Sequence, residues 1–388
     1  MKRTKLATAT TALLTAAALA LPQGAAAAPI RPYDTYPSQV SGMVAPRVTV
    51  TDGYFTSTDG KGTQIYWKKN LIPDAKASIA LIHGLAENQE RYDYITYRLN
   101  MAGYNVYRLD HRGHGRSAAP FTGVRKNLID NFEFVDRDIK QLVDTIHQEQ
   151  NGKVFMMGHS MGAMAAQFYA VNHPDDIDGL VTNGGGVPAN LYGPNTLAPE
   201  YTRADGQPAT SLVDPFIPHN GRPLQAFDSL FGVNILGALA DAGVPLQALP
   251  NGRPVESPWP LQQADVPNVF KIGVVTDPQV RNQLANDPLN SKVVNLSTAL
   301  QIAEAELYTG RHAKDYTKPT LIMHGDTDGL VPYPLDINWY NAVGSQDKHM
   351  ILWQDMMHET MNEPARDQVI DRAIEWLDSH VSAPAAGA

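Results

Sequence analysis

Short apolar runs alternate with longer amphipathic stretches along most of the chain. Residues 48–55 and 64–67 alternate apolar and polar positions on either side of an Asp-Gly-Lys-Gly turn at 59–62, which predicts a β-hairpin. Residues 78–82 form a continuous apolar run, as expected for a parallel strand that is buried on both faces. Further strands are predicted at residues 104–108, 154–157 and 178–183.

Helical patterns separate these strands. Residues 92–102 and the small-residue stretch after Ser160 are predicted helices, and the helix before residue 154 has an apolar face of Phe132, Val135, Ile139, Leu142, Val143 and Ile146. An alternation of strands and helices predicts a mostly parallel sheet that is flanked by helices. Ligands of such folds bind at the carboxyl ends of the strands, where His83, Asp110 and Ser160 lie.

The alternation stops at Gly184-Gly185-Gly186 and resumes with a strand at 320–323, a helix at 336–342, a strand at 350–353 and a helix at 363–380. We therefore predict a core of residues 47–186 and 317–382, interrupted by a cap at 187–316 that includes a helix near 296–308. An apolar island at 230–249 is either a lid that docks on lipid surfaces or ordinary cap core. Residues 28–46, with four prolines, are a predicted arm, and 383–388 a flexible tail.

The N-terminus combines a charged start, Lys2-Arg3-Thr4-Lys5, with an apolar run at 6–21 and a string of alanines. This order is typical of a secretory signal peptide, here residues 1–27. The run is too short and too rich in Thr and Ala for the alternative of a membrane anchor. Cleavage after Ala27 would take the net charge from −9 to −12. The predicted location is extracellular, periplasmic or in the cell envelope.

Composition excludes several classes of function. The 388-residue chain has no cysteine, which excludes disulfides, a thiol nucleophile and zinc-thiolate sites. It is acidic and has no basic cluster after residue 5, so nucleic acid is not an expected partner. A zinc motif at His358 fails because Asn362 stands where the second histidine is needed, and a calcium loop at Asp326 lacks its remaining ligands. We predict no cofactor and no metal.

The central chemical motif is Gly158-His159-Ser160-Met161-Gly162. In G-x-S-x-G, the glycines let the chain turn so sharply from strand to helix that the serine hydroxyl is exposed at the sheet edge. The helix that follows directs its N-terminus at charge that forms near Ser160. Backbone N–H groups of Met161 and Leu85 are the expected oxyanion donors.

A serine nucleophile needs a base, and the base needs an orienting acid. His358 follows the last predicted strand, while His83, His111, His114 and His324 lie near the same sheet edge; His83 and His324 are expected to hold loops in place. Asp326 and Asp328 both follow the strand at 320–323, and their spacing alone does not choose the acid.

Five motifs in order resemble the α/β-hydrolase fold and, within it, the monoacylglycerol lipase and lysophospholipase group, over residues 63–377. They are His83-Gly84 with Glu87 and Arg91-Tyr92, Asp110-x-Arg112-Gly113-His114-Gly115-x-Ser117, Gly158-His159-Ser160-Met161-Gly162, Gly325-x-x-Asp328-x-Leu330-Val331 and His358-Glu359-x-x-Asn362-Glu363. Residues 276–289 also look like the return from cap to sheet in this group.

The resemblance implies an eight-stranded sheet with an inserted, largely helical cap. It also implies Ser160 as nucleophile, Asp328 as acid, His358 as base, and Leu85 and Met161 as oxyanion donors. The expected function is hydrolysis of a lipid-like ester such as a monoacylglycerol or lysophospholipid. The chain departs from the group in its export signal and in a longer, proline-rich cap portion around 191–260. Alternatives are an acyltransferase, a proline-type peptidase and a non-catalytic binding module.

Overall fold

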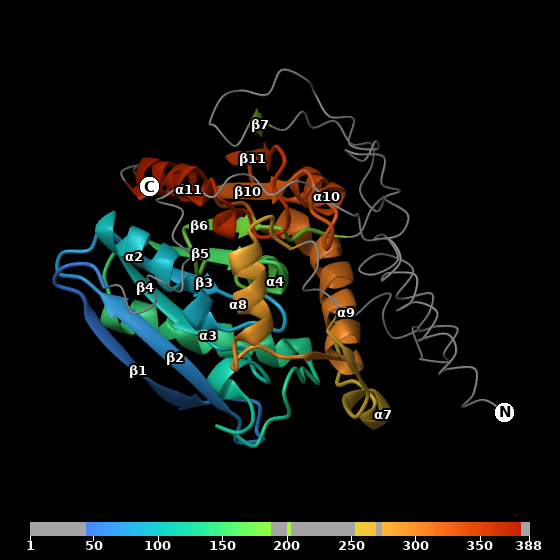
Figure 1. Ribbon diagram of the computed structural model, residues 1–388. Coiled ribbons are helices and arrows are strands. Elements are labelled where there is room, and N and C mark those ends of the chain that lie inside the picture. Colours follow the sequence, from blue (N-terminus) through green and yellow to red (C-terminus); the bar gives the residue numbers. More distant parts are fainter. Residues whose placement is uncertain (1–43, 188–199, 203–252, 269–273, 382–388) are drawn as a thin grey trace.

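A twisted sheet of nine strands forms the centre of the molecule (Figure 1). The computed structural model describes residues 44–187, 200–202, 253–268 and 274–381. The strand order is β1-β2-β4-β3-β5-β6-β10-β11-β7, with β2 antiparallel to both β1 and β4 and the other pairs parallel. The strands are β1 (Thr49–Thr56), β2 (Gln64–Leu71), β3 (Ala77–Ile82), β4 (Tyr104–Leu109), β5 (Val154–His159), β6 (Gly179–Asn183), β7 (Glu200–Thr202), β10 (Thr320–Gly325) and β11 (Lys348–Trp353).

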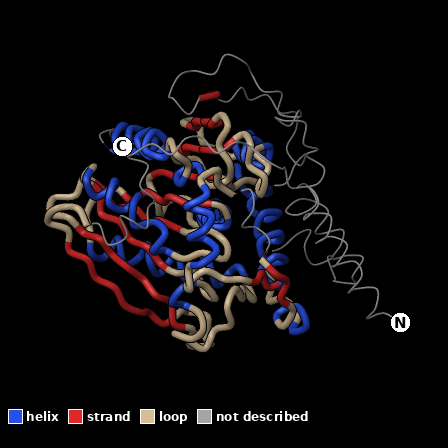
Figure 2. The backbone as a smooth tube through the Cα atoms, in the orientation of Figure 1, coloured by secondary structure: helices blue, strands red, loops and turns tan. Residues whose placement is uncertain are grey.

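Helices cover both faces of this sheet (Figure 2). The helices α2 (Asp93–Met101) and α11 (Arg366–Val381) pack on one face, whereas α3 (Phe132–Glu149), α4 (Met161–Asn172) and α10 (Pro334–Ala342) pack on the other. A further helix, α9 (Leu296–His312), packs against α4. Short 3-10 helices lie at Gln89–Tyr92, Gly115–Ser117, Ala313–Asp315 and Thr360–Asn362.

The central strands divide their side chains between two apolar cores. In β3, Ala80 and Ile82 join the core under α3 and α4, while Ile79 and Leu81 join the core under α2 and α11. This division follows from the two-residue period of a strand, which points successive side chains to opposite faces. Because both faces of β3 are buried, all of its positions except Ser78 are apolar.

The predicted fold class is confirmed. Eight of the nine strands, and every helix predicted in the core, lie within a few residues of the predicted positions. The closing helix begins at Arg366 rather than Glu363 because Pro364 disfavours a helical residue before it and a 3-10 turn at 360–362 takes its place. The ninth strand, β7, was not predicted and pairs with β11 at the sheet edge.

The described part of the predicted cap contains α7 (Trp259–Gln262), α8 (Pro278–Asn286) and α9. It also holds a small antiparallel pair, β8 (Asp265–Pro267) with β9 (Val293–Asn295), which the sequence did not reveal. The apolar island at 230–249 lies outside the described residues, as do the predicted signal peptide and most of the arm. None of the described helices combines the length and the apolar composition that crossing a bilayer requires.

Candidate active site

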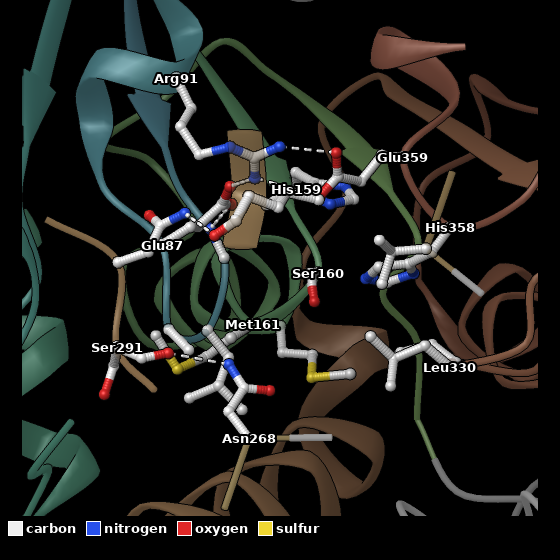
Figure 3. Close-up of a pocket in the computed structure, with 18 of the residues that line it drawn as sticks. Glu87, Arg91, His159, Ser160, Met161, Asn268, Ser291, Leu330, His358 and Glu359 are labelled. Atoms are coloured by element: carbon white, nitrogen blue, oxygen red, sulfur yellow. Dashed lines mark hydrogen bonds and ion pairs between the residues drawn. The ribbon is translucent and has the colours of Figure 1, made fainter. Parts of the chain in front are cut away.

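Ser160 lies at the turn between β5 and α4, where the backbone is strained. Its φ of 54° and ψ of −127° are rare for a residue with a side chain. The Ser160 N–H donates to the Asn183 carbonyl of the adjacent strand at 2.9 Å, and the Ser160 carbonyl accepts from Ala163 and Met164 in the first turn of α4. These bonds hold the strained turn, and the hydroxyl faces the pocket (Figure 3).

The two glycines of the motif are required by close backbone contacts. A Cβ on Gly158 would lie 2.3 Å from the Gly162 carbonyl oxygen, and a Cβ on Gly162 would lie 2.3 Å from the Ile82 carbonyl oxygen. Both distances are shorter than any normal contact between these atoms, and the opposing atoms belong to the backbone. The elbow can therefore form only with glycine at both positions.

Replacement of Gly162 with alanine is expected to lower the free energy of unfolding by about 3 kcal/mol, because the added methyl group forces β3 and α4 apart. Gly123→Ala is the matched control, since a Cβ there meets nothing within 4 Å. Urea denaturation of both variants measures the effect. Equal stability of the two would show that the elbow tolerates a side chain.

His358 and Asp328 approach each other from two different strands. The Nδ1 atom of His358, in the loop after β11, lies 2.7 Å from Oδ2 of Asp328, in the loop after β10. Both side chains are almost fully buried. The other carboxylate oxygen of Asp328 accepts from the Leu330 and Val331 N–H groups at 2.7 and 2.9 Å. The aspartate is thus aimed at the imidazole by its own loop.

The opposite nitrogen of His358, Nε2, has no hydrogen-bond partner among the described residues. Its ring lies beside the Ser160 hydroxyl in the pocket (Figure 3). Burial acts to raise the pKa of Asp328, but its interactions with His358 and His324 outweigh this effect and hold the pKa well below its usual range. An ionised Asp328 favours the tautomer of His358 that carries its proton on Nδ1 and leaves Nε2 as an acceptor.

Of the two aspartates that the sequence could not separate, only Asp328 contacts His358 in the structure. Asp326 turns toward a different loop, where its Oδ1 accepts from the Asp355 N–H at 2.7 Å. His83, His111 and His114 form a separate buried cluster with ring centroids 4.5 to 6.1 Å apart. Burial lowers the pKa of all three, so they are neutral.

The predicted oxyanion loop, residues 83–87, lies directly against the nucleophile. A Cβ on Gly84 would be 2.9 Å from Cβ of Ser160, and both Leu85 and Met161 line the pocket. Within the described part of the chain, neither the Leu85 nor the Met161 N–H donates to a protein group. His83 holds this loop: its ring contacts the Gly84 carbonyl at 2.8 Å and accepts from the His111 N–H at 2.9 Å.

Charged side chains gather at one end of the pocket. Arg91 pairs with Glu87 and, at 2.7 Å, with Glu359, and all three side chains are largely buried. Burial raises the pKa of Glu87, whereas the Arg91 guanidinium overcomes the effect of burial on Glu359 and holds its pKa below the usual value. Burial lowers the pKa of His159 beside them to about 3.

The pocket has two chemically different ends. Glu87, Arg91, His159 and Glu359 lie on one side of Ser160, whereas Met161 and Leu330 lie on the other (Figure 3). The lining also includes the apolar side chains of Leu85, Met164, Val274, Leu284, Ile302 and Val331, and the polar Asn268 and Ser291 lie on the same side of Ser160 as Met161 (Figure 3). A molecule with a polar head and an apolar tail would match this arrangement.

Asn183, at the end of β6, is a site residue that the sequence did not indicate. Its carbonyl accepts from Ser160, and its side chain contacts Nδ1 of His159 at 2.8 Å and donates to the His358 carbonyl at 3.2 Å. It also accepts from the Thr360 hydroxyl. This residue therefore connects the nucleophile elbow to the loop that carries His358. Its signal in the sequence is weak, because a lone asparagine at the end of a strand is common in loops.

Glu363 is a second residue that the sequence placed only within a motif. Its carboxyl group accepts from the Met357 N–H at 2.9 Å and from both the N–H and the hydroxyl of Thr276. The neighbouring Glu359 N–H donates to the Val274 carbonyl at 2.7 Å. The loop of His358 is thus bound to the segment that returns from the cap.

Stability is expected to depend on the protonation of Glu363. Burial raises its pKa from 4.5 to about 7 despite the donors around it. The protonated carboxyl group of Glu363 therefore stabilises the folded protein. This contribution is complete below pH 4.5, and it is lost as the pH rises through about 7 and the group ionises. Relative to wild type, Glu363→Gln should therefore gain about 1 to 3 kcal/mol in free energy of unfolding between pH 4.5 and 8.

Urea denaturation at these two pH values measures this gain. Glu375→Gln, at an exposed position of α11, is the control and should follow wild type at both values. A difference between Glu363→Gln and wild type that stays constant with pH would show that the carboxyl group is ionised throughout.

The fold and the site define a serine hydrolase of the α/β-hydrolase class. The family described as "Serine aminopeptidase, S33" matches residues 73–224 and 244–365, which is more than half of the chain. The chain belongs to this family. It is a serine ester hydrolase similar to monoacylglycerol lipases. This assignment excludes the alternative of a non-catalytic binding module.

Relatives that are similar in sequence carry lipase names. The monoacylglycerol lipase of Mycolicibacterium smegmatis is 29% identical over 313 residues, covering 79% of this chain and 90% of that protein. The mouse monoglyceride lipase is 33% identical, but over 34% of this chain and 42% of that protein. A soluble variant of the Saccharomyces cerevisiae monoglyceride lipase, solved with a substrate analogue, shares the fold with a TM-score of 0.63 at 18% identity, covering 90% of this chain and all of that one.

Proposed function

We propose that the protein hydrolyses carboxylic esters through Ser160, His358 and Asp328. Nε2 of His358 takes the proton of the Ser160 hydroxyl as its oxygen attacks the ester carbonyl. The Leu85 and Met161 N–H groups donate to the oxyanion that forms, and each such donor contributes about 3 kcal/mol to transition-state stabilisation. His358 then protonates the leaving alcohol, and water, activated by the same imidazole, releases the acid from Ser160.

The substrate class follows from the two ends of the pocket, and this observation carries the proposal. The side of the pocket with Met161 and Leu330 suits one acyl chain, whereas Arg91 and Glu359 on the other side suit hydroxyl groups of the alcohol. We infer a single-chain ester with a small polar head, such as a monoacylglycerol or a lysophospholipid. The names of the mycobacterial and mouse relatives support the first of these.

A substrate panel tests this proposal. Purified protein is assayed with monoacylglycerols of increasing chain length, a lysophospholipid, a triacylglycerol and a peptide-like anilide of the same acyl group. We expect the highest kcat/KM for a monoacylglycerol or lysophospholipid. Preference for the anilide would indicate the peptidase that the family description names. Transfer of the acyl group to added glycerol in preference to water would indicate an acyltransferase.

We further propose that the protein is exported and that residues 1–27 are removed. Support comes from the charged, apolar and small-residue segments of the N-terminus, in that order. N-terminal sequencing of protein recovered from the culture fluid or envelope should begin at Ala28. An intact Met1 on protein that remains in the cell interior would contradict export.

We also propose that the protein docks briefly on lipid surfaces through the cap. Equal turnover of monomeric and micellar ester would argue against such docking.

A further inference from the structure

A second histidine contacts the same carboxylate oxygen as the predicted catalytic base. His324, on β10, is fully buried and its Nε2 lies 3.0 Å from Oδ2 of Asp328, the atom that also binds Nδ1 of His358. On its other side, Nδ1 of His324 lies 2.8 Å from Oδ2 of Asp336. Asp328 is therefore flanked by two imidazoles, and a second buried aspartate lies behind the outer one.

The surroundings of His324 determine its protonation. Nε2 faces Oδ2 of Asp328 and, at 2.8 Å, the Val331 carbonyl oxygen, and Nδ1 faces Asp336. All three partners can only accept when both aspartates are ionised, so both ring nitrogens must carry a proton to satisfy them. The positive charge of a buried imidazolium compensates the negative charges of the two carboxylates beside it. Around a neutral ring, the two buried carboxylates would have no such compensation.

We propose that His324 is a permanently charged positioning residue, held in that state by Asp336, which sets how tightly His358 retains its proton. The proposal rests on the role of His358 and Asp328 in the proposed function. A cation in contact with Asp328 offsets part of the negative charge that would otherwise favour protonated His358. His358 consequently stays neutral, and available as a base, at lower pH than Asp328 alone would allow.

The titratable groups around both histidines are few within the described residues. His324 faces Asp328, Asp336 and the ring of Tyr333, whose centroid is 6.5 Å away. His358 faces Asp328 and the ring of His159, with centroids 4.7 Å apart. Glu359 and Arg91 lie beyond His159. His159 is neutral, so its ring adds no charge that could replace that of His324.

Electrostatics agree with the geometry. Burial acts to lower the pKa of His324, but its hydrogen bonds to Asp328 and Asp336 outweigh this and raise the pKa to about 10. Asp336 is held in place from the other side by the Gly185 N–H, which donates to its Oδ2 at 3.2 Å. Asp336 is fully buried, so water does not screen its interaction with His324.

Two variants separate charge from structure. In Asp336→Asn, the amide can donate to Nδ1 of a neutral His324, whose Nε2–H still donates to Asp328, so the geometry is kept and the charge is lost. In His324→Gln, the side-chain amide can donate a hydrogen bond to Asp328, but it carries no charge. Asp347→Asn is the matched control, because Asp347 pairs with His380 at 3.0 Å on the surface, in an aspartate–histidine pair remote from the pocket.

The experiment measures kcat/KM against pH for wild type and the three variants with a soluble ester. Loss of the cation should move the acid limb of the profile to higher pH by about one pH unit in both His324→Gln and Asp336→Asn, with no movement in Asp347→Asn. A lower kcat with an unmoved limb in both variants would overturn the proposal, since a structural role lowers activity without shifting the limb.

NMR spectroscopy of ring-labelled wild type tests the charge directly, even where a variant does not fold. The signals of His324, assigned by their loss in His324→Gln or by through-bond correlation, should report protons on both nitrogens at pH 8. A singly protonated ring would overturn the proposal. If wild type hydrolyses no ester, the proposed function fails, whereas this spectrum still decides the state of His324.

Discussion

Replacement of Ser160 with alanine is expected to lower kcat/KM for ester hydrolysis by about 10⁵-fold or more, the size of effect that removal of a nucleophilic serine has in other hydrolases. The variant keeps the backbone of the elbow, because alanine has the same conformational limits as serine at a φ of 54°. Its loss of activity would therefore report the missing hydroxyl rather than a missing fold.

Two measurements check this prediction. Hydrolysis of a short p-nitrophenyl ester gives the rate, and a fluorophosphonate probe, which reacts covalently with activated serines, gives the site. Ser379→Ala, on the exposed surface of α11, is the control and should label as wild type does. Undiminished labelling of the Ser160→Ala protein would show that another residue is the nucleophile.

Local sequence patterns predicted the core of the fold because its elements are defined by near neighbours. The amphipathic spacing of α3 places all six predicted apolar residues in the core. The continuous apolar run of β3 is explained by burial on both faces. Such patterns depend on periods of two and 3.6 residues, which are visible in a single segment.

The elements that the sequence did not reveal depend on distant partners. β7, β8 and β9 have three residues each, too few to show a period. Each is a strand only because another segment lies beside it: β7 pairs with β11, about 150 residues away, and β8 pairs with β9 across α8. Tertiary context of this kind overrides local propensity and leaves no local signal.

The same distinction applies to the site. Ser160 was predictable because the two glycines around it are needed for local backbone contacts. Asn183, Glu363 and Asp336 act through contacts between segments that are distant in the sequence. A single polar residue in a sequence does not predict such contacts. Asp336 was placed only at the start of a helix, yet its side chain reaches His324 on the preceding strand.

The choice between Asp326 and Asp328 shows what geometry adds. Both aspartates follow β10 within three residues, so both lie at the sheet edge where catalytic groups gather. The turn after β10 directs one carboxylate to His358 and the other to the Asp355 N–H. Only the position of the loop after β11, which is set by contacts with Glu363 and Val274, decides which of them meets an imidazole.

Asp328→Asn is therefore expected to lower kcat by about 10⁴-fold, with little change in KM for a short ester. The amide can still fill the site, but it neither holds the required tautomer of His358 nor stabilises the imidazolium that forms during attack. Rates with a p-nitrophenyl ester at saturating concentration measure the loss, and far-ultraviolet circular dichroism checks the fold.

Asp326→Asn provides the matched comparison, since it changes the same chemical group two residues away. Its amide oxygen can still accept from Asp355, so kcat should stay within about tenfold of wild type, because no group that contacts the reacting atoms has changed. The reverse order, with the larger loss in Asp326→Asn and both proteins folded, would assign the orienting acid to Asp326. It would also mean that the pairing of Asp328 with His358 is not the arrangement used in catalysis.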